Sequence, residues 1–357
     1  MTKPPATTIR GRGAAHNPGV RFDAYTRERE VPDLAIDDPS PPPRTFITLQ
    51  LAKSIISRNE SPDVPFSQSI NPYQGCEHGC VYCYARPTHA YLGLSPGLDF
   101  ETRIFAKQNA PELLRRELSR PGYRCELIAL GANTDPYQPA EREHRITRGI
   151  LDVLAEFHHP VGIVTKSSLV ERDLDILTAM ARKNLAHVFV SVTTLDSALT
   201  GKLEPRAVAP YRRIETIKRL AQAGIPCGVL MAPVIPFIND QDLEPVLEAA
   251  AAAGASMAGY VILRLPHEVK TLFRDWLARH YPLRAERVMA RIHDLRDGRD
   301  NDPEFGSRMQ GSGEFATLIR RRFALACTRL RLNSGERFKL DTTQFRVPGE
   351  SGQLGLF

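Results

Sequence analysis

The most informative part of the chain is the stretch Gly75-Cys76-Glu77-His78-Gly79-Cys80-Val81-Tyr82-Cys83-Tyr84. Half of the six cysteines of the chain stand here, in the spacing C-x3-C-x2-C. Thiolates are the natural ligands of iron in a cubane iron–sulfur cluster. Because only three thiolates are supplied, one iron of the cubane keeps an open position that can bind a small molecule. The spacing of Cys76, Cys80 and Cys83 therefore predicts a 4Fe-4S cluster with one open iron.

Two other metal sites are compatible with the same residues. One is a zinc knuckle with His78, or a distant residue, as its fourth ligand, and the other is an ordinary electron-transfer cluster. Zinc ribbons favour paired C-x2-C units, and the chain has no second pair. The loop also follows a predicted strand and precedes a series of βα units, so it is expected at the mouth where such barrels carry out chemistry. Motif and context together favour the cluster with an open iron.

Strand-like and helix-like segments alternate along the chain around and after the cysteines. The predicted strands cover residues 69–73, 126–131, 161–165, 188–193, 228–231 and 259–263. The predicted helices cover residues 111–119, 142–157, 171–183, 211–223, 243–253 and 269–281. This alternation indicates right-handed crossovers and a parallel sheet. Six units are two short of a closed barrel, so the prediction is an α/β protein with a partial (β/α)6 TIM-type barrel and a helical C-terminal extension, with a doubly wound sheet as the alternative.

Composition divides the chain further. The expected parts are a Pro/Arg-rich extended arm at 1–45, the barrel at 46–283 with its cysteine loop at 75–84, an Arg-rich helical extension at 284–348 and a flexible tail at 349–357. The arm lacks periodicity and contains a proline run that excludes helix; a leader without function is its alternative interpretation.

The net charge of +6 is mild for 357 residues and does not by itself indicate a nucleic-acid partner. Residues 284–337, however, hold twelve arginines and no lysine. Arginine presents a planar fork suited to phosphate, although solvated amphipathic helices explain the same pattern. No run of eighteen apolar residues is present and the N-terminus lacks an apolar signal segment, so a cytoplasmic protein without a membrane span is expected.

The cysteine loop, with an aromatic residue before its last cysteine and six βα units around it, resembles the radical S-adenosylmethionine (AdoMet) superfamily. The resemblance covers about residues 66–300 and is nearest to the spore photoproduct lyase branch, among its uncharacterised bacterial relatives. It implies that Cys76, Cys80 and Cys83 hold the cluster and that the open iron binds AdoMet. The implied activity is reductive cleavage of AdoMet to a 5′-deoxyadenosyl radical, with a flavodoxin or ferredoxin as electron donor.

The resemblance also implies AdoMet-binding residues. Tyr82, before the third cysteine, matches the residue near the adenine. The usual Gly-Gly-Glu motif is absent, and Thr134 and Asp135 occupy the place where the lyase branch has a hydroxyl followed by Asp. These two residues are suited to an ammonium group, or they form a turn in which Asp135 caps backbone amides. Lys166 matches a lysine that approaches the AdoMet carboxylate.

Four further positions match the branch. They are Ser191 for a ribose contact, Ala232 for a backbone contact to adenine, and Arg206, within Glu204-Pro205-Arg206, and Arg264 near the mouth. The two arginines are equally explained as members of loop salt bridges.

In the lyase branch a radical passes through tyrosines and a cysteine. Tyr84 matches one of the tyrosines and is the candidate catalytic residue, as a radical relay. Ala132 stands where the cysteine is expected. Because a thiol donates a hydrogen atom readily and a methyl group does not, repair of the thymine dimer is not assigned to this chain.

The chain ends in Gln353-Leu354-Gly355-Leu356-Phe357, after a Gly/Ser spacer. This resembles the peptide by which bacterial proteins dock on the DNA polymerase sliding clamp, so Gln353, Leu354, Leu356 and Phe357 are candidate partner-binding residues. The alternative is a tail that folds onto its own barrel.

The preferred hypothesis is therefore a radical AdoMet enzyme acting on a nucleic acid in connection with DNA repair. The same chemistry on a protein or small molecule is the first alternative. A non-catalytic iron–sulfur sensor tethered to the clamp and a zinc-binding module are the alternatives of another class.

Overall fold

The computed structural model of the chain describes residues 8–22, 43–334 and 339–349. The clamp-like peptide at 353–357 lies outside these ranges. Among the described residues, no helix is long and apolar enough to cross a membrane.

The main sheet has seven strands in the order β10-β9-β8-β7-β6-β3-β2. The parallel strands are β3 (Gln68–Ile70), β6 (Ile128–Leu130), β7 (Val161–Thr165), β8 (Ala186–Ser191), β9 (Cys227–Val234) and β10 (Met257–Ile262). From β3 to β10, the order of the parallel strands in the sheet is the same as their order in the sequence. A doubly wound sheet would reverse direction at a switch point, and this order does not. The predicted partial barrel is confirmed, with β2 (Ile56–Arg58) added antiparallel at one edge.

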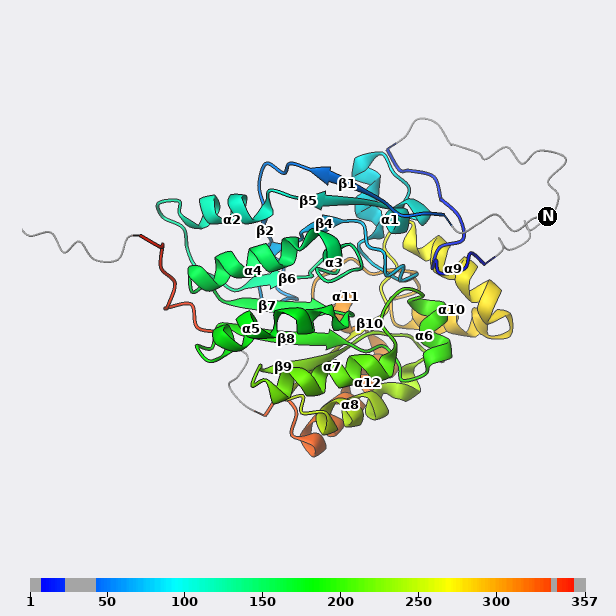
Figure 1. Ribbon diagram of the computed structural model, residues 1–357. Helices are drawn as coiled ribbons and strands as arrows, with labels where there is room; N and C mark the ends of the chain where they lie inside the picture. Colours follow the sequence, from blue (N-terminus) through cyan, green and yellow to red (C-terminus); the bar gives the residue numbers. More distant parts are fainter. Residues whose placement is uncertain (1–7, 23–42, 335–338, 350–357) are drawn as a thin grey trace, which may run out of the picture.

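Helices connect the parallel strands and cover one side of the sheet, as Figure 1 shows for α4, α5, α7 and α8. Their sequences are amphipathic, and their apolar sides join the strands in one large core. The long helices are α2 (Ala110–Leu118), α4 (Ile146–Glu156), α5 (Leu174–Ala181), α7 (Pro210–Gln222), α8 (Leu243–Ala252), α9 (Val269–His280), α10 (Ala285–Asp294) and α12 (Gly313–Leu330). Strands such as β7 are buried on both faces, because helices cover one face and the barrel interior the other.

Two predicted helices are interrupted. The segment predicted at 142–157 consists of α3 (Glu141–His144) and α4, because Arg145 between them adopts a left-handed backbone with φ of 50°. The segment predicted at 171–183 begins as the 3-10 helix η2 (Ser168–Asp173) and becomes α-helical only in α5.

A second, three-stranded sheet was not predicted. It has the order β1-β5-β4, with β1 (Phe46–Gln50), β5 (Arg103–Lys107) and β4 (Tyr73–Gln74). The strand predicted at 69–73 is in fact divided between the two sheets, since β3 ends at Ile70 and β4 begins at Tyr73. The cysteine loop therefore starts from the small sheet and lies beside the main one. The remaining short helices are η1 (Arg86–Leu92), α1 (Leu98–Thr102), α6 (Ser197–Leu203), η3 (Asp240–Asp242), η4 (Pro282–Arg284) and α11 (Ser307–Gln310).

The two ends of the described chain pack on this body. Helix α12 lies against α8, and its side chains Ile319, Ala326 and Cys327 belong to the main core. Residues 8–22 lie against the cysteine loop, α1 and α9. The four-part division of the chain stays a prediction.

Candidate functional site

The cysteine loop leaves β4 and runs to η1, and two glycines allow its tight path. Gly75 and Gly79 have φ of 81° and 68°, a region that side chains disfavour. A Cβ on Gly75 would also lie 2.9 Å from the carbonyl oxygen of Phe100. The loop is covered, since Cys76 and Cys80 are only 7% and 8% exposed.

The three thiols lie close enough to influence one another, as ligands of one cluster must. Burial is the main reason that the pKa of Cys80 rises to about 12, and the neighbouring Cys83 raises it as well. The pKa of Cys76 is raised by burial, then by the carboxylate of Asp135 and by the other two thiols. Among the described residues, no three His, Cys, Asp or Glu side chains converge as the ligands of a single metal ion would. Thiolates that each bind a different iron of a cubane do not need to converge on one point, so three thiols in one loop are compatible with such a cluster.

His78, the fourth ligand in the zinc alternative, is directed elsewhere. Its Nδ1 lies 3.3 Å from the carboxylate of Asp135, and both side chains are buried. Asp135 also accepts hydrogen bonds from Thr165 Oγ1 and from the backbone N–H of Lys166, each at 2.7 Å, and from the backbone N–H of Tyr137. Burial raises the pKa of Asp135, but His78 and these bonds outweigh it and hold the pKa at about 2.

Asp135 therefore braces the cysteine loop against the end of β7. Its neighbour Thr134 is buried and donates to the carbonyl of Tyr73. The predicted contact of both residues with AdoMet stays a prediction, while the turn-capping role of Asp135 is present in the geometry.

Three of the residues predicted to bind AdoMet come together beside Cys80. Lys166, at the end of β7, donates from Nζ to Ser191 Oγ on β8 at 3.1 Å. The same Nζ lies 5.9 Å from the centroid of the Tyr82 ring. Burial lowers the pKa of Lys166, but Cys80 and Glu204 raise it more, so the side chain stays a cation. The group offers one positive charge, one hydroxyl and one aromatic ring to a bound molecule.

Glu204 holds this group in place and was not selected as a site residue from the sequence. It is 1% exposed and accepts hydrogen bonds from the hydroxyls of Tyr82 and Thr193. It also forms an ion pair with Arg213. Burial raises the pKa of Glu204, but Arg213 and Lys166 lower it to about 2. The only sequence signal was its place before Pro205 and Arg206.

Arg206, which was selected, contacts the cysteine loop. It forms an ion pair with Glu77 at 3.0 Å, as the salt-bridge alternative predicts. Ala232 lies in β9 and precedes a cis peptide bond to Pro233.

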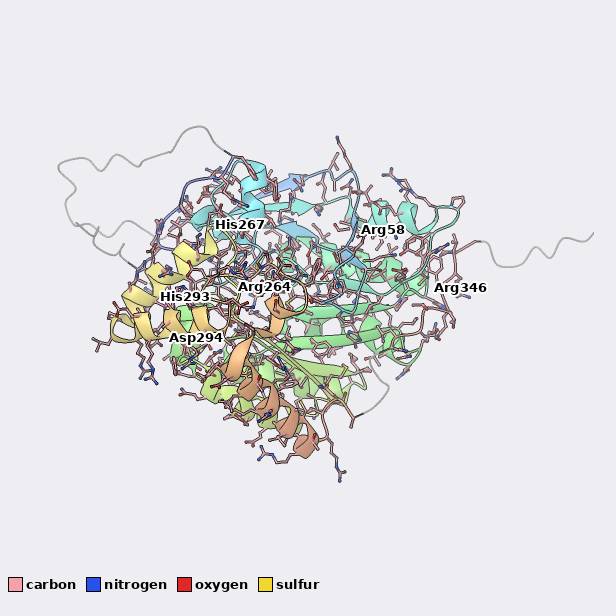
Figure 2. All side chains as sticks on the ribbon, turned by 180° about the vertical axis from the view of Figure 1, so that it is seen from behind. Arg58, Arg264, His267, His293, Asp294 and Arg346 are labelled. Atoms are coloured by element: carbon pink, nitrogen blue, oxygen red, sulfur yellow. The ribbon has the colours of Figure 1, made fainter. Side chains whose placement is uncertain are left out.

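Tyr84 and Arg264 form a separate pair at the mouth. The hydroxyl of Tyr84 donates to the backbone carbonyl of Ala132, and the guanidinium of Arg264 lies 5.7 Å from the ring centroid. Nε of Arg264 is buried without a hydrogen-bond partner among the described residues. Nη1 lies 3.7 Å from the sulfur of Met309. Figure 2 shows Arg264 near the middle of the rear view. Within the described part of the chain, this guanidinium therefore keeps a donor without a protein acceptor.

A partial barrel that carries a loop with three cysteines beside the ends of its parallel strands defines a class of cysteine-loop barrel proteins. Comparison with known proteins agrees: residues 70–250, about half of the chain, match the family described as the Radical SAM superfamily, and the chain belongs to that superfamily.

Similar proteins include the uncharacterized protein Rv2578c of Mycobacterium tuberculosis, with 40% identity over 61% of this chain and 65% of that protein. The uncharacterized protein MJ0683 of Methanocaldococcus jannaschii is 29% identical over 48% of this chain and 61% of that protein. This chain thus matches less than two thirds of either relative. Among solved structures, spore photoproduct lyase complexed with dinucleoside spore photoproduct has a TM-score of 0.57 at 14% identity, covering 80% of this chain and 79% of that one. This likeness shows the fold.

Proposed function

We propose that this chain is a radical AdoMet enzyme in which Cys76, Cys80 and Cys83 hold a 4Fe-4S cluster. The observation that supports the proposal most is the cation of Lys166 beside Cys80, grouped with Ser191 and Tyr82. A carboxylate, a ribose hydroxyl and an adenine ring are the groups that a cation, a hydroxyl and an aromatic ring bind. When bound, the cluster and AdoMet supply a 5′-deoxyadenosyl radical that removes a hydrogen atom from the substrate.

The protein contributes positioning. Asp135 fixes the cysteine loop and the backbone at Lys166, while Glu204 fixes the hydroxyl of Tyr82. Both carboxylates have a pKa of about 2, so they keep these contacts at neutral pH. Holding a substrate C–H close to the radical carbon in a site that excludes water is the main catalytic task of such a barrel.

For the substrate we propose a nucleic acid, and specifically a damaged base in DNA. Arg264 and Tyr84 support this, because a guanidinium with a buried, unpaired Nε beside a half-exposed ring suits a phosphate next to a base. The phenol of Tyr84 donates to the carbonyl of Ala132, the position where the lyase branch has its cysteine, and Tyr84 is the proposed radical relay. Ala132 itself favours the alternative of a protein or small-molecule substrate.

The proposed partners are a flavodoxin or ferredoxin as electron donor and the DNA polymerase sliding clamp, bound through Gln353, Leu354, Leu356 and Phe357. The proposed location is the cytoplasm. A non-catalytic sensor tethered to the clamp is the alternative of another class.

The test is anaerobic reconstitution of the cluster, addition of AdoMet and dithionite, and mass spectrometry of 5′-deoxyadenosine and methionine, with and without damaged DNA. Cys80→Ala is expected to abolish both products. Cys327→Ala is the matched control, since this thiol lies in α12, outside the loop, and both products are expected to persist. A cluster that forms but yields no deoxyadenosine in either condition would favour the sensor. Product formation that rises with DNA and falls steeply with salt would support the nucleic-acid substrate.

A further inference from the structure

Residues 8–22, here called the strap, contact the cysteine loop although they are far from it in sequence. Ala14 is 2% exposed and packs in one apolar cluster with Cys80, Val81 and Tyr82. The backbone of Gly13 passes so close to the loop that a Cβ on it would lie 1.8 Å from the carbonyl oxygen of Gly79. The strap therefore covers the middle cysteine of the loop by direct backbone contact.

A buried ion pair joins the strap to the loop. Both oxygens of Glu101 accept backbone N–H groups of the strap, from Gly13 at 3.0 Å and from Ala14 at 2.8 Å. Glu101 also binds the guanidinium of Arg86, and both of these side chains are fully buried. Arg86 in turn donates from Nε to the carbonyl of Cys80 at 2.9 Å. One chain of bonds thus runs from the strap to the backbone of a proposed cluster ligand.

The strap continues past the loop and is attached near its end by polar contacts. Asn17 exchanges two hydrogen bonds of 3.0 Å with Asp99, one to its side chain and one from its backbone. His16 lies 3.5 Å from Asp275 of α9, and both side chains are more than a third exposed. Arg21 forms an ion pair of 2.6 Å with Glu268.

These attachments differ from those of the barrel strands. Within the described residues, no β-ladder joins the strap to the body. Its links are hydrogen bonds and ion pairs that each involve a side chain, the close backbone approach at Gly13, and one small apolar residue. Segments with few buried apolar contacts open locally at a lower free energy than the core. The strap is therefore expected to open at a lower free energy than the sheet.

We propose that the strap is a detachable cover of the cysteine loop: the loop receives its cluster while the strap is open, and the strap then closes over it. This rests on the proposed function, because it takes the loop as the cluster site. Arg86 and Glu101 are positioning residues in this scheme, since they act through the backbone of Cys80. Neither readout below requires AdoMet cleavage, so a failure of this proposal is distinguishable from a failure of the proposed activity.

The first measurement uses the unloaded full-length protein and iodoacetamide, with labelling of each cysteine followed by mass spectrometry. The double variant His16→Ala/Arg21→Ala removes the ion pairs of the strap with Asp275 and Glu268, together with the hydrogen bond from Arg21 to the carbonyl of Pro87, and it leaves residues 75–84 unchanged. Labelling of the three loop cysteines is expected to become about tenfold faster, because each lost pair favours the open strap by a modest factor. Cys227, buried in β9, reports opening of the core and is expected to keep its rate. Arg115→Ala, which breaks the remote ion pair with Glu156, is the matched control.

The second measurement is hydrogen exchange of the unaltered protein. The amides of Gly13 and Ala14, which bind Glu101, are expected to exchange faster than those of β7 and β8. Loop labelling at the wild-type rate in a folded double variant would overturn the proposal. If the variant unfolds, Cys227 will be labelled as well, and the hydrogen exchange of the unaltered protein then tests the proposal. Strap amides that exchange at the rate of the core strands would overturn the proposal, and strap amides that exchange faster would support it.

Discussion

Replacing Glu101 by glutamine tests whether the buried ion pair with Arg86 holds this part of the molecule together. The carboxylate of Glu101 is fully buried and accepts three groups, two strap amides and the guanidinium. Glutamine has the same shape but no charge, and one of its two terminal atoms is a donor. The change therefore affects charge and hydrogen bonding and leaves packing almost intact.

The expected cost follows from these contacts. Arg86 is 0% exposed, and among the described residues Glu101 supplies the one carboxylate bound to it, so its loss leaves a buried charge that backbone carbonyls must satisfy. Breaking a buried pair in this way costs about 3–5 kcal/mol. The donor nitrogen of glutamine would also face a strap N–H, leaving a buried donor unsatisfied at about 1–3 kcal/mol, part of which is contained in the first figure.

The assay is urea unfolding of the unloaded protein, followed by circular dichroism, for Glu101→Gln and for Glu156→Gln. Glu156 pairs with Arg115 in the same way, but these side chains are 41% and 48% exposed. An exposed pair contributes at most about 1 kcal/mol, so the control is expected to unfold almost as the wild type does. Equal losses for the two variants, or a loss below about 1 kcal/mol for Glu101→Gln, would refute the reasoning.

Three further outcomes are expected. Lys166→Met should weaken AdoMet binding to the reconstituted protein at least about tenfold, as measured by calorimetry. The control Lys183→Met should bind AdoMet with the affinity of the wild type. Equal affinity of the two variants would show that Lys166 does not contribute to the site. Gly131→Ala should lower the free energy of unfolding, measured with urea, by about 3 kcal/mol. The reason is that Gly131 has φ of 88° and a Cβ would lie 2.2 Å from a carbonyl oxygen of β7. Gly201 has open space around it, so the control Gly201→Ala should leave the free energy of unfolding unchanged. Burial lowers the pKa of three histidines to about 4: His89, His159 and His187. The unfolded chain binds their protons first, so stability is full above about pH 6.5 and should fall by about 1.4 kcal/mol per pH unit for each histidine as the pH drops towards 4; a urea midpoint that stays constant between pH 7 and pH 5 would contradict this.

The periodic part of the fold was predictable from the sequence because each βα unit carries its own signal. The strand predicted at 161–165 is observed with the same bounds, and the helix predicted at 243–253 ends one residue earlier. The break at Arg145 was not predictable, since arginine shows no preference for a left-handed backbone. The small sheet was missed because β1 and β5 are 57 residues apart at their paired ends, Phe46 and Arg103, and local patterns do not reveal such pairing.

The candidate site was predictable where a residue matched a family position, as for Lys166, Ser191 and Tyr82, which the fold brings together. Glu204 was not selected, because a glutamate in a loop most often lies in solvent and only the tertiary structure shows Arg213 and Tyr82 around it. Residues 8–22 were expected to be an arm without periodicity, and nothing local in them indicates their contact with the cysteine loop.

The strap is synthesised well before the α9 region that it contacts. Its partners Glu268 and Asp275 follow Arg21 and His16 by 247 and 259 residues (268 − 21 and 275 − 16). A ribosome that adds about 5–20 residues per second needs roughly 12–50 seconds for that distance. The strap is thus made long before α9, and its contacts with Glu268 and Asp275 can form only after its contacts with Glu101 are already possible.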